Sequence, residues 1–225
     1  MNIVITGSSK GIGFFLYKNL KKKHKVLGIS RSGGKSTDFI CDVSKKNQVK
    51  ETFKQINKID VLINNASITN VNKDKVLNFE NTISVNLNGV FYCSHYSLNK
   101  LKMSKIKKII NISSINAHVG FPNNPGYVSS KGGINALTRS LAVDYGKFGI
   151  KANSLSLGYI SDGMSKSSYN SALKKKRRSL NTILNHWGTP NDVLGAVNFL
   201  ISNQSNYITG SDIVIDGGWL AKGFK

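Results

Sequence analysis

Cysteine, proline, histidine and acidic side chains are all scarce in this chain. Its 225 residues include two cysteines, three prolines, four histidines and 11 aspartates and glutamates together. Cys41 and Cys93 lie far apart and lack CxxC spacing, so the sequence predicts neither a disulfide framework nor a zinc site. We interpret both as small buried apolar residues and expect no metal site.

Long apolar runs are missing as well. No run approaches the roughly 18 residues that a membrane-spanning helix needs, and the first residues, MNIVITG, enter an apolar strand without a basic leader segment. We therefore expect a cytoplasmic protein that does not enter a membrane. A chain of 225 residues suits one α/β core, so we expect a single domain over residues 1–225.

Positive charge is abundant, with 32 lysines and arginines and a formal net charge of +21. Such charge can attract an acidic partner, or it can reflect a general lysine bias. The lysines occur along the whole chain without a recognisable base-reading element, which favours the second interpretation and no specific nucleic-acid partner. The denser cluster LKKKRRSL at 173–180 supports a narrower hypothesis, a docking surface for an acidic protein.

Apolar runs alternate with segments of helical spacing, which predicts an α/β fold with a mainly parallel, doubly wound sheet. The connection RSGGKSTD at 31–38 is shorter than the roughly 10–12 residues of a helical crossover, so we predict no helix between the second and third strands. The expected strands are 2–6, 25–30, 38–41, 60–64, 107–113, 151–157 and 212–216. The expected helices lie near 11–23, 45–57, 80–103, 125–146 and 190–202.

The glycine-rich stretch TGSSKGIG at 6–13 follows the first strand and opens the first helix. Glycines allow a sharp turn and close approach of a ligand, and the helix N-terminus offers N–H groups to a phosphate. Lys10 lies inside this loop, and Arg31 lies just after the second strand, where an NAD-selective protein usually carries an acid. Two cations without a carboxylate favour NADP(H). If both are ordinary surface cations, NAD(H) is the cofactor.

The stretch GYVSSKGG at 126–133 places Tyr127 and Lys131 on one face of a helix, one turn apart. An ammonium near a phenol lowers the phenol's pKa from about 10 and prepares it for proton transfer. Taken alone, such a pair is a common pair of surface neighbours. The pair therefore supports a catalytic interpretation only in combination with the motifs around it.

Taken together in this order, the motifs resemble the short-chain dehydrogenase/reductase family from end to end. The matching elements are TGSSKGIG, NNAS at 64–67, Asn86, INISS followed by YVSSK, LGYI at 157–160 and ITGSDIVIDGGW near the end. The resemblance implies a Rossmann-type sheet of about seven parallel strands with helices on both faces. It also implies a homotetramer or dimer that reduces ketones or oxidises secondary alcohols with a nicotinamide cofactor.

The resemblance implies a catalytic tetrad of Asn86, Ser114, Tyr127 and Lys131. Tyr127 would carry the proton, Ser114 would polarise the carbonyl, and Asn86 would hold a water that links Lys131 to solvent. The implied cofactor contacts are Gly7, Ser9, Lys10, Gly11, Ile12, Gly13, Arg31, Asp42, Val43, Asn65, Ala66, Tyr127, Lys131 and Ile160.

Three departures from the family pattern lie near the cofactor: Ser67 for the last glycine of NNAG, Leu157 for the proline before Gly158, and the short connection at 31–38. We expect the short connection at 31–38 to leave the adenine pocket more open than is usual in the family. Residues 161–187 should form a substrate lid with apolar and basic side chains. The closest general resemblance is to 3-oxoacyl-carrier-protein reductases, with an acidic acyl carrier protein as partner. A sugar or polyol substrate, or a cofactor-binding sensor without turnover, remains an alternative.

Overall fold

Seven parallel strands form one sheet in the computed structural model, which describes residues 1–69 and 73–222. The strand order is β3-β2-β1-β4-β5-β6-β7. The order reverses between β1 and β4, and in doubly wound sheets ligands bind in the crevice that opens there at the carboxyl ends of the strands. The strands are β1 (Asn2–Thr6), β2 (Lys25–Ser30), β3 (Phe39–Ile40), β4 (Val61–Asn64), β5 (Lys108–Ser114), β6 (Lys151–Leu157) and β7 (Asp212–Ile215).

Alternate residues of the buried strands serve two cores. Ile3 and Ile5 of β1 belong to one cluster and Val4 to the other, because successive side chains of a strand point to opposite faces. Both faces are covered, which explains why the strands read as continuous apolar runs.

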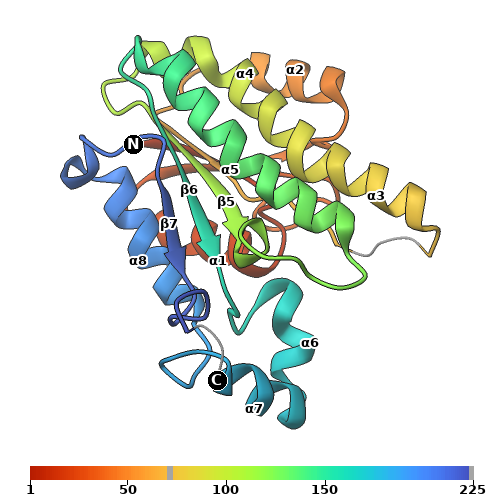
Figure 1. The fold of residues 1–225 in the computed structure, drawn as a ribbon. Helices are drawn as coiled ribbons and strands as arrows, with labels where there is room; N and C mark the ends of the chain where they lie inside the picture. Colours follow the sequence, from red (N-terminus) through yellow and green to blue (C-terminus); the bar gives the residue numbers. More distant parts are fainter. Residues whose placement is uncertain (70–72, 223–225) are drawn as a thin grey trace.

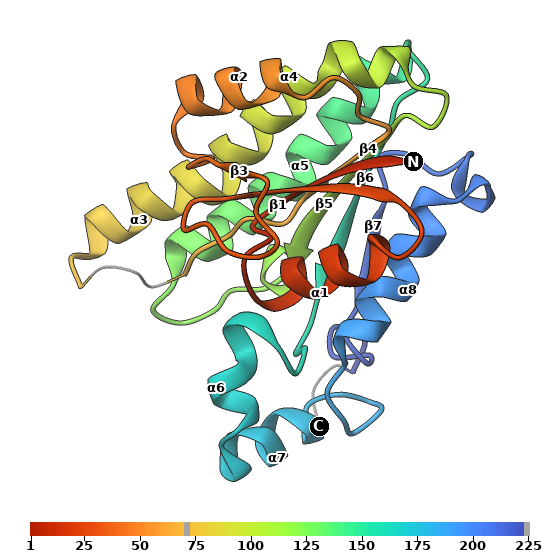
Figure 2. The ribbon, with the colours of Figure 1, turned by 180° about the vertical axis from the view of Figure 1, so that it is seen from behind.

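Helices cover both faces of the sheet, as expected (Figure 1). The turned view shows α1 and α8 on the face opposite α2, α4 and α5 (Figure 2), and α3 packs beside α5. The helices are α1 (Gly11–Leu20), α2 (Lys46–Gln55), α3 (Lys75–Ile83), α4 (Gly89–Met103), α5 (Pro125–Gly146), α6 (Lys166–Tyr169), α7 (Ala172–Leu180) and α8 (Pro190–Ile201).

The connection from β2 to β3 contains no helix, which confirms the prediction. It folds against the glycine loop: the hydroxyl of Ser36 donates to the carbonyl of Ser8 at 2.7 Å, and a Cβ on Gly28 would lie 1.9 Å from the carbonyl oxygen of Ser36. A cleft of about 320 Å³, lined by Phe14, Tyr17 and lysines, lies between this connection and α1.

Two regions contain elements that the sequence does not indicate. The helix expected near 80–103 begins at Lys75 and is interrupted by a π-helical segment, Ser84–Asn88. The segment 161–187 contains the helices α6 and α7, which lie beyond the carboxyl ends of the strands (Figure 1). Across the described ranges, no helix has both the length and the apolar character that crossing a bilayer requires.

Candidate active site

Tyr127 and Lys131 lie in the first two turns of α5, where Pro125 occupies the first turn. Proline suits this position because the first helical N–H groups have no partner within the helix. The ammonium of Lys131 donates to the carbonyl of Ile112 on β5 at 2.9 Å and lies 5.4 Å from the centre of the Tyr127 ring. The two side chains therefore sit together over the end of β5.

Burial controls the protonation of this pair. Burial raises the pKa of Tyr127 above its ordinary value, and a hydrogen bond with the Ser114 side chain opposes that rise. Burial also lowers the pKa of Lys131 to about 7. The expected lowering of the Tyr127 pKa by Lys131 is thus not seen, because burial disfavours the charged form of each group.

Ser114 ends β5 and begins the turn Ile115–Ala117. The Ser114 hydroxyl oxygen accepts a hydrogen bond from the backbone N–H of Asn116 at 3.2 Å, which fixes the position of the side chain. The hydroxyl proton is not used in this bond and can be donated toward Tyr127 or a substrate oxygen. The structure therefore brings Ser114, Tyr127 and Lys131 together.

Asn86 lies fully buried in the π-helical segment. Its side chain accepts from the Ile68 N–H at 2.8 Å and donates to the Ile68 carbonyl at 3.0 Å and to the Ser130 hydroxyl at 3.1 Å. Because Ser130 precedes Lys131, Asn86 joins the loop after β4 to α5. Isolated π turns occur frequently at functional sites, and here the wide turn holds the predicted asparagine.

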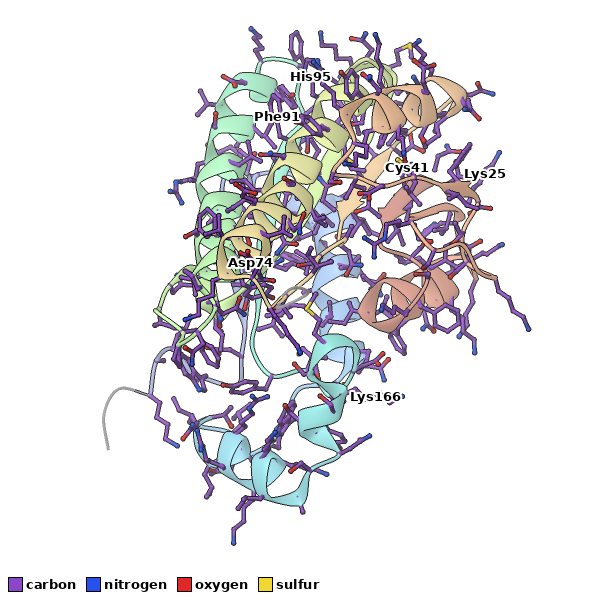
Figure 3. All side chains as sticks on the ribbon, turned by 90° about the vertical axis from the view of Figure 1, so that its right-hand side faces the viewer. Lys25, Cys41, Asp74, Phe91, His95 and Lys166 are labelled. Atoms are coloured by element: carbon purple, nitrogen blue, oxygen red, sulfur yellow. The ribbon has the colours of Figure 1, made fainter. Side chains whose placement is uncertain are left out.

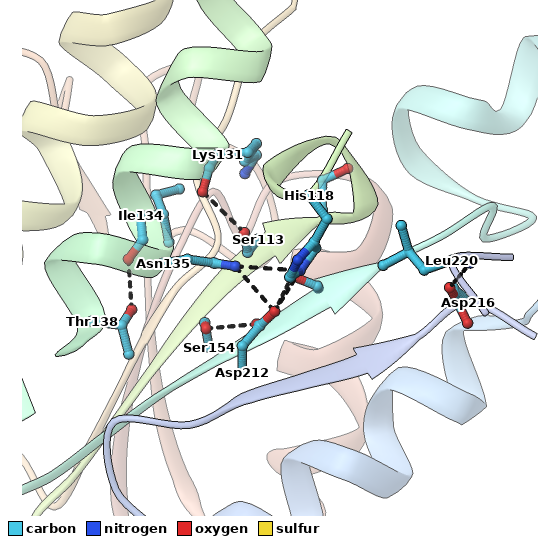
Figure 4. Close-up of polar contacts among 12 residues, drawn as sticks. Ser113, His118, Lys131, Ile134, Asn135, Thr138, Ser154, Asp212, Asp216 and Leu220 are labelled. Atoms are coloured by element: carbon cyan, nitrogen blue, oxygen red, sulfur yellow. Dashed lines mark hydrogen bonds and ion pairs between the residues drawn. The ribbon is translucent and has the colours of Figure 1, made fainter. Parts of the chain in front are cut away.

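A polar network centred on Asp212 fixes the loop that follows Ser114 (Figure 4). One oxygen of Asp212, at the start of β7, meets His118 Nε2 at 2.8 Å, Asn135 Nδ2 at 3.0 Å and the Ser156 hydroxyl at 2.7 Å. The other oxygen accepts from the Ser154 hydroxyl at 2.6 Å. Since Asn135 lies one turn after Lys131 on α5, the carboxylate ties the loop, the helix and two strands together.

The glycine loop forms a cradle that larger residues would fill. Gly7 has a φ of +68°, and a Cβ there would lie 2.7 Å from the Ala66 Cα. A Cβ on Gly13 would lie 2.2 Å from the Gly7 carbonyl oxygen. Asn65 donates to the Gly7 carbonyl at 3.1 Å, so the β4 end supports the loop at the N-terminus of α1. This arrangement fits the diphosphate of a dinucleotide.

The other predicted cofactor residues surround this cradle. Lys10 and Arg31 are exposed, and Val43 and Ile160 are buried. Asp42 accepts from the Ser44 backbone and hydroxyl, which shapes the turn after β3. The remaining predicted contacts are each half-buried: Ser9 lies in the glycine loop, Gly11 and Ile12 in the first turn of α1, and Ala66 after β4.

The segment after β6 reaches back to the glycine loop. A Cβ on Gly11 would lie 2.8 Å from the Gly163 Cα, so the two backbones touch. Aromatic side chains hold α6 and α7 in place: Trp187 contacts the rings of Tyr159 and Tyr169, and Arg178 lies 4.7 Å from the Tyr159 ring centre.

Several residues of this region were missed from the sequence. The Thr6 hydroxyl accepts from the backbone N–H groups of Asn65 and Ala66 at 3.0 and 3.1 Å, and a hydroxyl at the end of the first strand was the available signal. No local signal marks His118 and Asp212, which are 94 positions apart. Among the described residues, no group of three metal-ligating side chains gathers that could hold an ion.

A strand-order reversal, a glycine cradle at a helix N-terminus, and a half-buried tyrosine beside a buried lysine and a serine are together typical of a dinucleotide-dependent oxidoreductase. Comparisons with known proteins lead to the same class. The family model described as "Enoyl-(Acyl carrier protein) reductase" matches residues 10–220. An uncharacterized oxidoreductase of Bacillus subtilis is 33% identical over 97% of this chain and 90% of its own. A 3-oxoacyl-[acyl-carrier-protein] reductase of Rickettsia felis is also 33% identical, over 96% and 95%.

Solved structures agree with this match. The aldohexose dehydrogenase of Thermoplasma acidophilum has a TM-score of 0.89 at 28% identity and covers 99% of this chain and 94% of its own. A gluconate 5-dehydrogenase of Burkholderia cenocepacia, in complex with NADP and tartrate, has a TM-score of 0.87 at 26% identity, over 98% and 95%. The chain belongs to the short-chain dehydrogenase/reductase family and is an NAD(P)-dependent enzyme of that family.

Proposed function

We propose that the protein interconverts a ketone and a secondary alcohol with NADP(H), and that Tyr127 transfers the proton. The observation that carries the proposal is the half-buried Tyr127 side chain, which lies beside Ser114 and whose ring centre is 5.4 Å from the Lys131 ammonium. Asn86 completes the set through Ser130. An intact set of this kind argues against a sensor that binds the cofactor without turnover.

The nicotinamide ring, when bound, supplies or accepts the hydride at the substrate carbon. In reduction, negative charge develops on the carbonyl oxygen and requires a proton and hydrogen-bond donors. The Tyr127 hydroxyl gives the proton and the Ser114 hydroxyl donates a hydrogen bond to the same oxygen. A protonated Lys131 stabilises the phenolate that remains, which makes its pKa of about 7 relevant to the working pH.

The preference for NADP(H) rests on charge around the cradle. Lys10 in the glycine loop and Arg31 after β2 are both exposed, and no acid lies at positions 29–33. Two cations without a carboxylate suit the 2′-phosphate of NADP(H), and an acid near that position would select NAD(H).

Two substrate classes have support. A 3-oxoacyl thioester is favoured by the reductases among the sequence relatives and by exposed basic residues of α7, which suit docking of an acidic carrier protein. A sugar or sugar-derived substrate is favoured by the aldohexose and gluconate dehydrogenases among the solved structures. For either class we propose that residues 161–187 act as the lid and that the enzyme is a homotetramer or dimer.

The test is NADPH oxidation over a panel of 3-oxoacyl thioesters, keto sugars and keto acids, with Tyr127→Phe beside the wild type. We expect the variant to bind NADPH normally and to lose about 10²-fold or more in turnover, as for loss of a general acid. Tyr207→Phe is the matched control, because Tyr207 is fully exposed. Nearly unchanged turnover by Tyr127→Phe would refute the assignment.

A further inference from the structure

A cavity of about 380 Å³ lies between the beginnings of α3 and α5. Both helices begin at the end of the molecule that carries α6 and α7, as the two opposite views agree (Figures 1 and 2). Figure 3 marks the start of α3 by Asp74 and the start of α6 by Lys166. The cavity is lined from the α3 side by Lys73, Lys75 and Phe79 and from the α5 side by Asn123, Pro125 and Gly126.

The cavity adjoins α5 where this helix approaches α3 closely. Gly126 lines it and is followed directly by Tyr127. A Cβ on Gly126 would lie 3.0 Å from the Phe79 Cα, so α3 and α5 approach each other closely here. This tight contact fixes the cavity relative to the backbone of Tyr127.

The charge of the cavity is positive. Lys73 and Lys75 are exposed, and neither forms an ion pair with a described residue. The carboxylate of Asp74, between them, caps α3 by accepting from the Leu77 N–H at 3.0 Å. The first turn of α5 contains no acid, and its N-terminal end adds the positive pole of a 22-residue helix.

A buried polar group adjoins the same wall. Asn124 lies between the lining residues Asn123 and Pro125, is 8% exposed, and donates from its amide to the Thr69 hydroxyl at 2.7 Å. Its side-chain oxygen is buried without a hydrogen-bond partner among the described residues. Because this oxygen is inaccessible and Asn124 is not among the lining residues, it belongs to the protein interior behind the cavity wall.

We propose that this cavity binds an anionic group, a carboxylate or a phosphate, of the enzyme's own carbonyl or alcohol substrate. The substrate class is therefore an acidic carbonyl compound, such as a keto acid, a sugar acid or a sugar phosphate. This inference rests on the proposed function and favours the second substrate candidate, because an acyl thioester carries no charge next to its ketone. The two lysines determine specificity, and Tyr127 carries out the chemistry.

The test compares acetoacetate with methyl acetoacetate, which present the same ketone with and without a negative charge. For wild type we expect a KM at least about 10-fold lower for the acid, since a hydrogen bond to a charged group contributes roughly that factor. The double variant Lys73→Gln/Lys75→Gln should lose this preference and leave the ester unaffected. Lys46→Gln/Lys50→Gln removes two exposed charges from α2 and should change neither substrate.

Calorimetric binding in the absence of cofactor separates this inference from the proposed function. Acetoacetate should bind wild type and the control variant more tightly than the Lys73/Lys75 variant. Competition by inorganic phosphate or by acetate identifies the preferred anion. Equal binding of acid and ester by wild type, or an equal loss of both in the Lys73/Lys75 variant, would overturn the inference. No turnover of either compound, with the charge-dependent binding intact, would instead count against the proposed function.

Discussion

Lys131 should make the stability of the folded protein depend on pH between its lowered pKa and its ordinary one. Its side chain is 2% exposed, and burial lowers its pKa to about 7 from the ordinary value of 10.5. Between these two values the unfolded chain binds more protons than the folded chain. Stability therefore rises as pH increases through this window and is lowest below pH 7.

The size of the effect follows from the two pKa values. The full shift corresponds to at most about 5 kcal/mol, of which about 2 kcal/mol falls between pH 7 and pH 9. Lys131→Met removes the titrating group. Wild type should therefore gain about 2 kcal/mol over the variant between these two pH values. Lys108, whose pKa burial lowers to about 8, titrates in both proteins and cancels in the comparison.

Reversible urea unfolding at pH 7, 8 and 9 measures this difference directly. Lys50→Met, at an exposed position of α2, controls for loss of a charge and should follow wild type at every pH. A free-energy difference between wild type and Lys131→Met that is the same at pH 7 and pH 9 would refute the reasoning. The lysine would then not be held in a site that disfavours its charge.

Two further predictions concern positions outside the Tyr–Lys pair. Asp212→Asn should destabilise the protein by about 1–3 kcal/mol, because it weakens charge-assisted hydrogen bonds from His118, Asn135 and two serines. Thermal unfolding measures the loss, with Asp144→Asn as the control because Asp144 is exposed. Equal stability of the two variants would contradict the prediction. Arg31→Asp should weaken NADPH more than NADH, measured as the two dissociation constants by fluorescence titration; an equal loss for both cofactors contradicts the 2′-phosphate assignment.

The sequence predicts the layered fold well because buried parallel strands have a simple signature. Each of the seven expected strands appears within one residue of its expected ends, since both faces of the sheet are apolar. The helix at 125–146 has the expected bounds because Pro125 marks its start. The absence of a helix between β2 and β3 follows from chain length alone.

Other features depend on contacts that a single sequence does not reveal. Helix α7 buries none of its residues, so it has no apolar stripe to detect, and its Lys175 and Arg178 side chains instead lie over aromatic rings. The protonation of Tyr127 and Lys131 depends on how deeply they are buried. The Asp212 network joins segments that meet only after the sheet has formed.

The π-helical segment Ser84–Asn88 joins α3 and α4 without a break. A π turn contains about one residue more than an α turn, and each residue of an α-helix turns the chain by about 100°. The segment therefore sets the rotational phase of α3 relative to α4. Deleting one residue there would keep a continuous rod, but it would turn Lys75 and Phe79 by about a quarter of a revolution away from α5. In this chain, a single residue of helical length thus determines which side of α3 faces the start of α5.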